Sequence, residues 1–144
     1  MDGGDAVKFH SKCDNIPNTL TIIKSKGNRR FGGFTSKTWE SEVTFKKDKK
    51  AFLFSLDKNK IYSNKNDGYS IFCAKGFGPC FGYNDQNGCT IEIFENPILR
   101  ENLKTYESNS NSYNFYGDNN ALSEDGQGNG IFAEEYEIFQ TIFS

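Results

Sequence analysis

Five side chains of this sequence could act together as metal ligands or nucleophiles. The chain of 144 residues holds four cysteines and a single histidine. A structural zinc site usually takes its cysteines in close pairs, because two ligands on one turn lower the cost of ordering the site. Here six and eight residues separate the last three cysteines, so we expect buried, reduced thiols and no metal site. The candidate ligands are His10, Cys13, Cys73, Cys80 and Cys89.

A thiol that reacts directly with peroxide is an alternative from a different functional class. Such a thiol needs a lowered pKa, which a helix N-terminus or nearby cations would provide. Cys80 lies in the glycine-rich segment GFGPCFG (76–82), and Lys75 is the nearest cation in the sequence. We keep Cys80 or Cys73 as candidate redox thiols, with Cys89 as the third member of the set, and favour packed thiols over reactive ones.

Any catalytic triad in this chain would have to use His10. His10 shares one face of a predicted helix with Phe9 and Cys13, where a packed, hydrogen-bonded histidine is the common outcome. The segment GFGPCFG does not match the dinucleotide-binding pattern G-x-G-x-x-G, and Pro79 removes an amide that a phosphate would use. We therefore predict no catalytic residue, no cofactor and no enzymatic activity.

Two groups of charged residues are candidates for an interaction surface. Lys46 and Lys47 belong to a basic cluster around Asp48, which we interpret as a solvated hairpin turn that could contact acidic protein or lipid headgroups. In the acidic group, Glu135 and Glu137 share one face of a predicted strand. Glu134 lies on the other face. We expect these carboxylates to find cations within the domain in preference to a partner.

Composition excludes several classes of protein. Seventeen basic and 19 acidic residues leave a net charge of −2, which argues against a nucleic-acid binder. No apolar run reaches the roughly 18 to 20 residues of a membrane-spanning helix. The N-terminus MDGGDAVKFH lacks the apolar stretch of a secretory signal, and the cysteines are too sparse for a disulfide scaffold. We expect a single cytoplasmic domain over residues 1–144.

Apolar periodicity predicts many short strands and few helices. A helix is expected over 5–13, and Asp14-Asn15 would end it. Strands are expected over 19–26, 29–35, 51–56, 61–62, 69–74, 89–94 and 132–143. Residues 97–104 are expected to form a short helix. Residues 106–130 should form a long surface loop held down by Tyr113, Phe115 and Tyr116. The fold class is then mostly β: a two-sheet antiparallel β-sandwich flanked by one or two short helices.

Two strands are predicted to lie inside a sheet, because they carry apolar residues on both faces. One is AFLFSL (51–56), in which we expect Phe52 and Phe54 to be buried, one on each face. The other is 132–143, predicted to be central and not at an edge. Gly32-Gly33 indicates a bulge or a close approach of another segment.

Six segments of the sequence, taken in order, resemble those of the TLDc domain family. This is the domain of the oxidation-resistance proteins. The six segments are FHSKCDN, TLTIIKSK, FGGFTSKTW, AFLFSL, FGPCFG and EEYEIF. The resemblance implies a β-sandwich flanked by helices, which agrees with the fold expected from periodicity. Family members usually begin with a further strand, which this sequence lacks, so we expect an N-terminally truncated domain. Its unpaired sheet edge could form an edge-strand dimer.

The resemblance also implies a function: a non-enzymatic interaction domain that protects against oxidative stress. Its implied partner is a protein, since several TLDc proteins associate with the cytosolic sector of the vacuolar proton-pumping ATPase. Two alternatives remain: the thiol-based antioxidant described above, and a scaffold domain of a larger multidomain protein.

Overall fold

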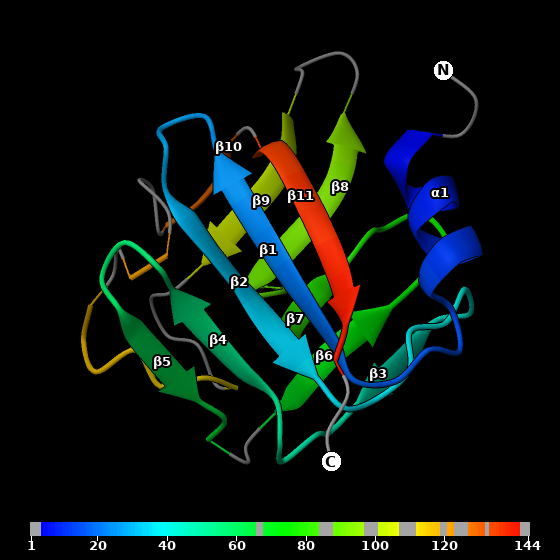
Figure 1. The fold of residues 1–144 in the computed structure, drawn as a ribbon, viewed down its shortest axis with the longest axis horizontal. Coiled ribbons are helices and arrows are strands. Elements are labelled where there is room, and N and C mark those ends of the chain that lie inside the picture. The colour runs from blue at the N-terminus through cyan, green and yellow to red at the C-terminus, as the bar shows by residue number, and fades with distance from the viewer. Residues whose placement is uncertain are drawn as a thin grey trace.

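The computed structural model describes residues 4–65, 68–83, 88–96, 101–106, 112–118, 121–122, 127–131 and 133–141. One helix, α1 (Gly4–Cys13), precedes the strands (Figure 1). The first six strands are β1 (Thr19–Ser25), β2 (Arg30–Thr35), β3 (Thr44–Lys46), β4 (Phe52–Ser55), β5 (Lys60–Ser63) and β6 (Tyr69–Cys73). They are followed by β7 (Cys80–Tyr83), β8 (Ile91–Asn96), β9 (Glu101–Tyr106), β10 (Gln127–Ile131) and β11 (Ala133–Gln140).

The strands form two antiparallel sheets that face each other. One sheet has five strands in the order β11-β1-β2-β4-β5, and the other has six in the order β10-β9-β8-β7-β6-β3. In Figure 1 the five-stranded sheet lies in front of the other, and α1 lies beside β11. The predicted fold class, a two-sheet β-sandwich with a short flanking helix, is confirmed.

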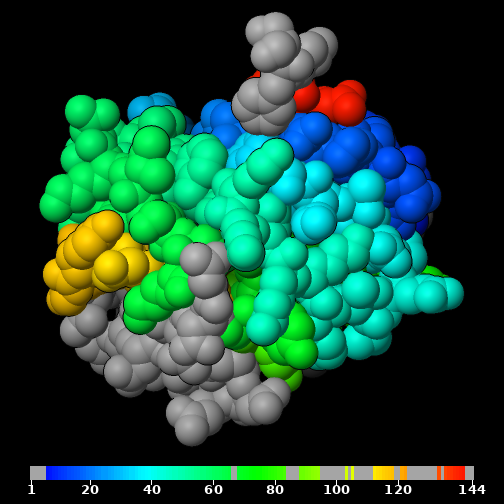
Figure 2. Space-filling view, turned by 90° about the horizontal axis from the view of Figure 1, so that it is seen from below, coloured from blue at the N-terminus to red at the C-terminus, as the bar shows by residue number. Residues whose placement is uncertain are grey.

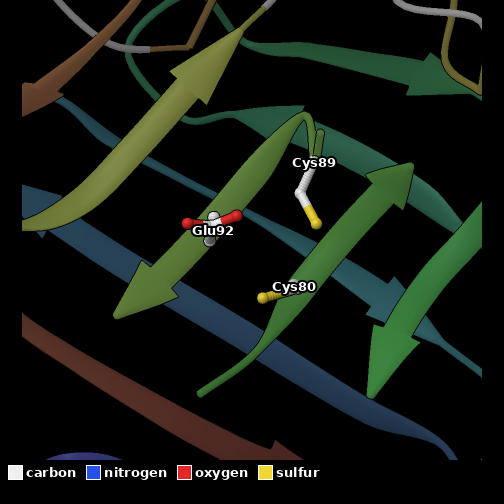
Figure 3. A group of neighbouring side chains, drawn as sticks. All are labelled: Cys80, Cys89 and Glu92. Atoms are coloured by element: carbon white, nitrogen blue, oxygen red, sulfur yellow. The ribbon is translucent and has the colours of Figure 1, made fainter. Parts of the chain in front are cut away.

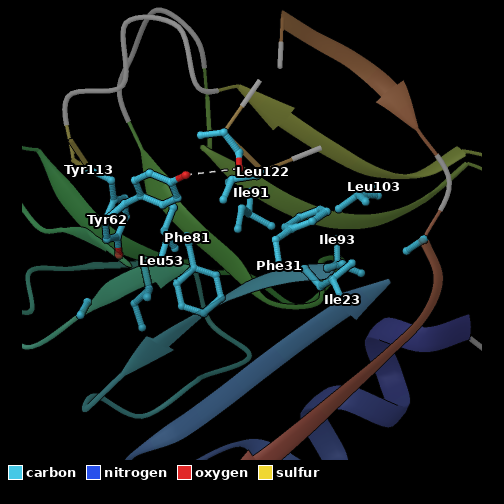
Figure 4. Packing of buried hydrophobic residues seen from close by; sticks show 14 of the residues in the cluster. Ile23, Phe31, Leu53, Tyr62, Phe81, Ile91, Ile93, Leu103, Tyr113 and Leu122 are labelled. Carbon is cyan, nitrogen blue, oxygen red and sulfur yellow. Dashed lines mark hydrogen bonds between the residues drawn. The ribbon is translucent and has the colours of Figure 1, made fainter. Parts of the chain in front are cut away.

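The core between the sheets is built from large side chains of both (Figure 4). Its largest member is Trp39, which is fully buried and contacts the rings of Phe9 and Phe81 edge to face. The indole Nε1–H donates to Thr19 Oγ1 at 3.0 Å, so the buried donor is satisfied. Trp39 thereby ties α1, the five-stranded sheet and the six-stranded sheet together.

Helix α1 forms and ends as its sequence predicts. Phe9 and His10 are buried on one face, while Lys8 and Lys12 on the other are exposed. The helix ends at Cys13, and Asn15 then takes a φ of 66°, a left-handed conformation that asparagine tolerates well. Within the described residues, no helix is long and apolar enough to cross a membrane.

The chain crosses between the sheets at one end of the sandwich, where the sequence predicted a hairpin. Strand β3 pairs with β6 in the six-stranded sheet, whereas β4 pairs with β2 and β5 in the other. Residues 47–51 are therefore a crossover and not a hairpin turn. Figure 2 looks at this end, where residues coloured cyan to teal, from the segments around β3, form a large part of the surface.

Two predictions for the C-terminal half are wrong. Residues 101–106 form strand β9, not a helix, because they pair with β8 from Ile91↔Thr105 to Asn96↔Glu101. Residues 97–100 lie outside the described residues. The predicted loop 106–130 contains strand β10 at its end, which pairs with β9 although QGNGI has no apolar alternation. Backbone hydrogen bonds at a sheet edge do not require that alternation.

The three aromatic residues expected to hold down this loop behave differently. Tyr113 and Phe115 are buried, and Tyr113 Oη donates to the carbonyl of Ser70 at 2.8 Å. Tyr116 is 71% exposed, so its ring is not an anchor. Two of the three anchors are therefore confirmed.

The two strands expected inside a sheet have different outcomes. Strand β4 lies between β2 and β5, as predicted, but Phe52 and Phe54 share one face because side chains alternate along a strand. Leu53 occupies the opposite, core face, and Phe52 is only half-buried. Strand β11 lies at the edge of its sheet, not at its centre. The prediction relied on apolar residues on both faces of this strand, but on one face Phe139 is 47% exposed to solvent.

Candidate functional site

An open groove runs between α1 and the edge strand β11. Its volume is about 920 Å³. The helix and the residues after it line one wall with Lys8, Phe9, Lys12, Cys13 and Ile16. The other wall is β11, from Glu135 to Gln140, with Ala133 and Thr19 at the margin. The groove thus lies along an edge of the five-stranded sheet.

One edge of β11 is used by its own sheet and the other faces the groove. β11 pairs with β1 from Thr19↔Gln140 to Ser25↔Ala133, and no second strand pairs with it among the described residues. The amide of Thr141 donates to the carbonyl of Asn18 at 2.7 Å, toward β1. Because successive amides of a strand point in opposite directions, the amides of Ile138 and Gln140 point away from β1. This edge can therefore accept a further strand.

The walls of the groove carry opposite charges. Lys8 and Lys12 are exposed on the helix, and Glu135 and Glu137 are exposed on β11. As predicted, both glutamates lie on one face of the strand, opposite Lys24 and Ile22 in the register. The side chain of Glu134 lies outside the described residues. A bound segment would meet cations on one side and carboxylates on the other.

A second cluster is formed by two thiols and a carboxylate on the six-stranded sheet (Figure 3). Cys80 on β7 lies directly opposite Glu92 on β8, and Cys89 precedes β8. The sulfur atoms and a carboxylate oxygen lie within 4.8 Å of one another. Among the described residues, this is the group of possible metal ligands that the fold brings together, and it excludes His10, Cys13 and Cys73. Cys80 and Cys89 were candidates from the sequence, but Glu92 was not, because it meets Cys80 only through the pairing of β7 with β8.

The environment of this cluster opposes ionisation of the Cys80 thiol. Cys80 is fully buried, and burial, followed by its hydrogen bond to Cys89, raises the pKa of the Cys80 thiol well above its usual value. Burial also raises the pKa of Cys73. Zn²⁺ accepts two thiolates and a carboxylate as ligands, but at roughly 3.8 Å between ligand atoms around a tetrahedral ion. Metal binding would require both thiols to lose their protons, and burial opposes that loss at Cys80.

Comparison with known proteins identifies the fold family. A family model described as the TLDc domain matches residues 1–142. The chain belongs to the TLDc domain family. TLDc domains are generally regulatory and non-enzymatic, and family membership supports a role in protein interaction.

One curated relative of this TLDc domain is the MTOR-associated protein MEAK7 of Danio rerio. The two sequences are 28% identical over 85 residues. The match covers 59% of this chain and 16% of the relative. This TLDc domain therefore corresponds to a small part of that protein.

The basic residues singled out in the sequence lie away from the groove. Lys46, on the edge strand β3, donates through Nζ to Thr38 O at 2.7 Å and also pairs with Glu40. Lys47 Nζ lies 5.9 Å from the ring centroid of Tyr69, a cation–π distance. Neither residue lines the groove. The TLDc domain therefore does not gather Lys46 and Lys47 with the glutamates into one site.

Asp48, expected in a solvated turn, is instead a buried hydrogen-bond acceptor. It accepts from Thr35 Oγ1 at 2.7 Å, from the amide and hydroxyl of Ser36, and from the amide of Lys50. Burial raises its pKa, but these hydrogen bonds outweigh burial and leave the pKa lower than usual. Asp48 therefore stabilises the crossover between the sheets. The lysines on either side of it had favoured a solvated turn in the sequence analysis.

His10 is a packed, hydrogen-bonded residue, as predicted. Its Nδ1 lies 2.6 Å from Asp14 Oδ1, and its Nε2 lies 2.8 Å from the carbonyl oxygens of Ala74 and Phe77. The ring therefore holds the C-terminal end of α1 to the segment between β6 and β7.

Proposed function

We propose that this TLDc domain is a non-enzymatic protein-binding module whose partner binds in the groove between α1 and β11. The observation that carries the proposal is the outer edge of β11, which no strand of the described residues pairs with and which forms one wall of a groove large enough for an extended segment. Unpaired amides and carbonyls of an edge strand are a template for another strand. The partner therefore adds a strand along β11, with main-chain hydrogen bonds to the amides of Ile138 and Gln140.

The charges of the groove select the partner segment and set its register. A strand that runs between Lys8 and Lys12 on one side and Glu135 and Glu137 on the other must present both signs of charge. Complementary charges at an interface contribute mainly to specificity and to the rate of association. In this proposal Glu135 and Glu137 act toward the partner, contrary to our expectation that they find cations within the domain, while Lys46 and Lys47 serve the fold.

The partner we propose is a protein of the cytosolic sector of the vacuolar proton-pumping ATPase, as the family resemblance implies. The domain would then act in the cytoplasm, where binding to one state of its partner better than another shifts the partner between states. Protection against oxidative stress follows from that regulation. The name of MEAK7 associates that relative with mTOR, which makes an mTOR complex a second partner to assay.

Strand addition is tested with Gln140→Pro, compared with Gln140→Ala. Proline removes the amide that points into the groove but leaves the hydrogen bonds between β11 and β1, so the sheet keeps its own pairing. We expect Gln140→Pro to weaken binding to the purified cytosolic ATPase sector at least tenfold, and Gln140→Ala to leave it unchanged. Calorimetry or surface plasmon resonance measures both. Equal binding by the two variants would overturn strand addition.

The charge component is tested by reversing Glu135 and Glu137 to lysine together. We expect a slower association rate, with an effect that diminishes as salt is raised. Glu42→Lys is the matched control, since Glu42 is exposed but does not line the groove. If the control slows association equally, net charge and not the groove is responsible.

A second copy of the chain could use the same edge, and this edge-strand dimer is an alternative occupant. The further strand that the family resemblance implies before α1 would compete for it. Solution mass measured by light scattering distinguishes the two occupants: a dimer that Gln140→Pro dissociates supports self-pairing in place of a partner strand.

The thiol antioxidant and the scaffold domain remain alternative functions. The buried, protonated state of Cys80 and Cys73 disfavours the first.

A further inference from the structure

The outer face of the five-stranded sheet carries a second apolar surface, which borders the β11 groove at Phe139. Directly paired residues of neighbouring strands place their side chains on the same face, so the register defines rows across the sheet. One row is Phe139, Leu20, Phe34 and Phe52, and the next is Glu137, Ile22, Gly32, Phe54 and Ile61. None of these side chains belongs to the core between the sheets. Strands that are apolar on both faces are typical of sheets covered on both sides.

This surface is a trough and not a dome. Its floor is recessed, since Phe34 is 5% and Phe54 7% exposed. Its margins protrude: Ile61 is 66%, Leu56 54% and Phe139 47% exposed. A hollow of about 400 Å³ lies over the side of the trough nearest β4 and β5. No helix or strand of the described residues lies in front of it, as Figure 1, which looks onto this face, shows.

The width of the trough suits one α-helix. Four strand spacings separate β11 from β5, which is about 19 Å at roughly 4.8 Å per spacing. A helix with its side chains is about 10 to 12 Å wide. A single helix therefore fits between the margins formed by Phe139 and Ile61.

The charge around the trough is uneven. Lys26, Arg30 and Lys60 are exposed at the end near the β1–β2 turn, and none forms an ion pair within the part of the chain that the structure describes. Asp57, which accepts from the amide of Arg30 at 2.6 Å, is an exposed carboxylate at that end, and Glu135 and Glu137 lie on the same face of β11, so the cations at that end outnumber the carboxylate there. Lys60 also lines the hollow. An occupant with carboxylates at that end would complement these cations.

We propose that this trough binds an amphipathic α-helix of a protein partner, with acidic residues at the end that lies over the β1–β2 turn. The helix presents apolar residues at i, i+3, i+4 and i+7 to the floor. A membrane surface fits less well, because interfacial lipid binding inserts protruding apolar side chains, whereas Phe34 and Phe54 are recessed. This site shares Phe139 with the β11 groove, but its floor and its other margin, at Ile61, lie outside that groove, and its occupant does not have to pair with the edge of β11.

The test is selection of helical peptides from a display library against the whole domain. The library has a fixed helical framework with randomised residues on one face and at both ends. Enriched peptides should carry apolar residues at helical spacing and an excess of Asp and Glu at one end. Their affinity should fall at least tenfold with Ile61→Glu and with the pair Arg30→Glu and Lys60→Glu. Val43→Glu is the control, since Val43 is 69% exposed on another part of the surface.

Ile61 is exposed on an edge strand, so Ile61→Glu should fold, and Leu56→Glu serves as a second variant on the same margin. Failure to enrich helical peptides overturns the proposal, as does equal loss of affinity with Val43→Glu. A wild-type dimer that Ile61→Glu dissociates would instead identify a second copy as the occupant. Sedimentation with phosphatidylcholine–phosphatidylserine vesicles, abolished by Ile61→Glu, would identify a membrane. Gln140→Pro should leave peptide binding unchanged, which separates this proposal from the one for the β11 groove.

Discussion

The carbonyl oxygen of Thr21 lies 1.8 Å from the position that a Cβ atom would take on Gly32. The same Cβ would lie 3.0 Å from Cζ of Phe54, which pairs with Gly32 across β2 and β4. Strands β1 and β2 pair along this stretch, so the neighbouring backbone could make room only by breaking register. The close approach predicted from Gly32-Gly33 is confirmed, and it explains why only glycine fits at residue 32.

Gly32→Ala should therefore destabilise the domain by about 3 kcal/mol, at the upper end of ordinary single substitutions, because backbone must move. Urea denaturation measures the change in free energy of unfolding. Gly76→Ala is the matched control, since a Cβ there would meet no atom within 4 Å. Its cost should stay within about 0.5 kcal/mol. Equal costs for both variants would contradict the close approach.

Leu53→Ala and Phe54→Ala should each cost roughly 3 kcal/mol, because both side chains are buried, on opposite faces of β4. Phe52→Ala should cost less, since Phe52 is half-buried beside the stacked ring of Phe34. Chemical denaturation of the three variants gives the ranking. If Phe54→Ala costs less than about 1 kcal/mol, the assignment of its burial is wrong.

Asp48→Asn should destabilise the domain at neutral pH by about 2 kcal/mol, since an amide cannot accept from all the donors that surround the carboxylate. The native pKa of Asp48 lies below the usual 3.8. Its ionised form therefore stabilises the fold above that pH, and the contribution is lost as the pH falls through the native pKa. The difference in melting temperature between wild type and Asp48→Asn should shrink from pH 6 to pH 3. A difference that stays constant over this range would contradict the role of the charge.

Native thiol reactivity should be confined to Cys13. Cys13 is half-buried, whereas Cys73, Cys80 and Cys89 are 1%, 0% and 5% exposed. With an aromatic disulfide reagent at pH 8, one thiol should react while the protein is folded, and the other three only as fast as the domain opens. Fast reaction of a second thiol in the native state would show that the cluster at Cys80 is accessible.

Replacing Cys73, Cys80 and Cys89 together by alanine should leave partner binding and protection against oxidants intact, after stability losses are taken into account. Protection by a binding module does not depend on thiolate chemistry. The measurement pairs cell survival under peroxide with peroxide consumption by the purified proteins. A folded triple variant without protection, beside a wild type that consumes peroxide, would favour the redox alternative.

Local patterns in the sequence were sufficient for most of the fold. Strands β1, β2, β4, β6 and β8 and helix α1 follow from apolar periodicity and turn residues, because these depend on neighbours along the chain. The packed state of His10 follows from its place on the helix face. Six short segments in the order typical of the family were enough to predict the TLDc fold, and the family match confirms the family.

Sheet order and the sites that depend on it were decided by tertiary structure. β9 and β10 are strands because partners supply their backbone hydrogen bonds, which no local pattern encodes. The edge position of β11 depends on which strands pair, and that in turn creates the groove with Lys8 and Lys12. Likewise, Cys80 meets Glu92 only through the register of β7 with β8. Contacts between distant residues reflect packing of the whole chain, and periodicity over a few residues carries no information about them.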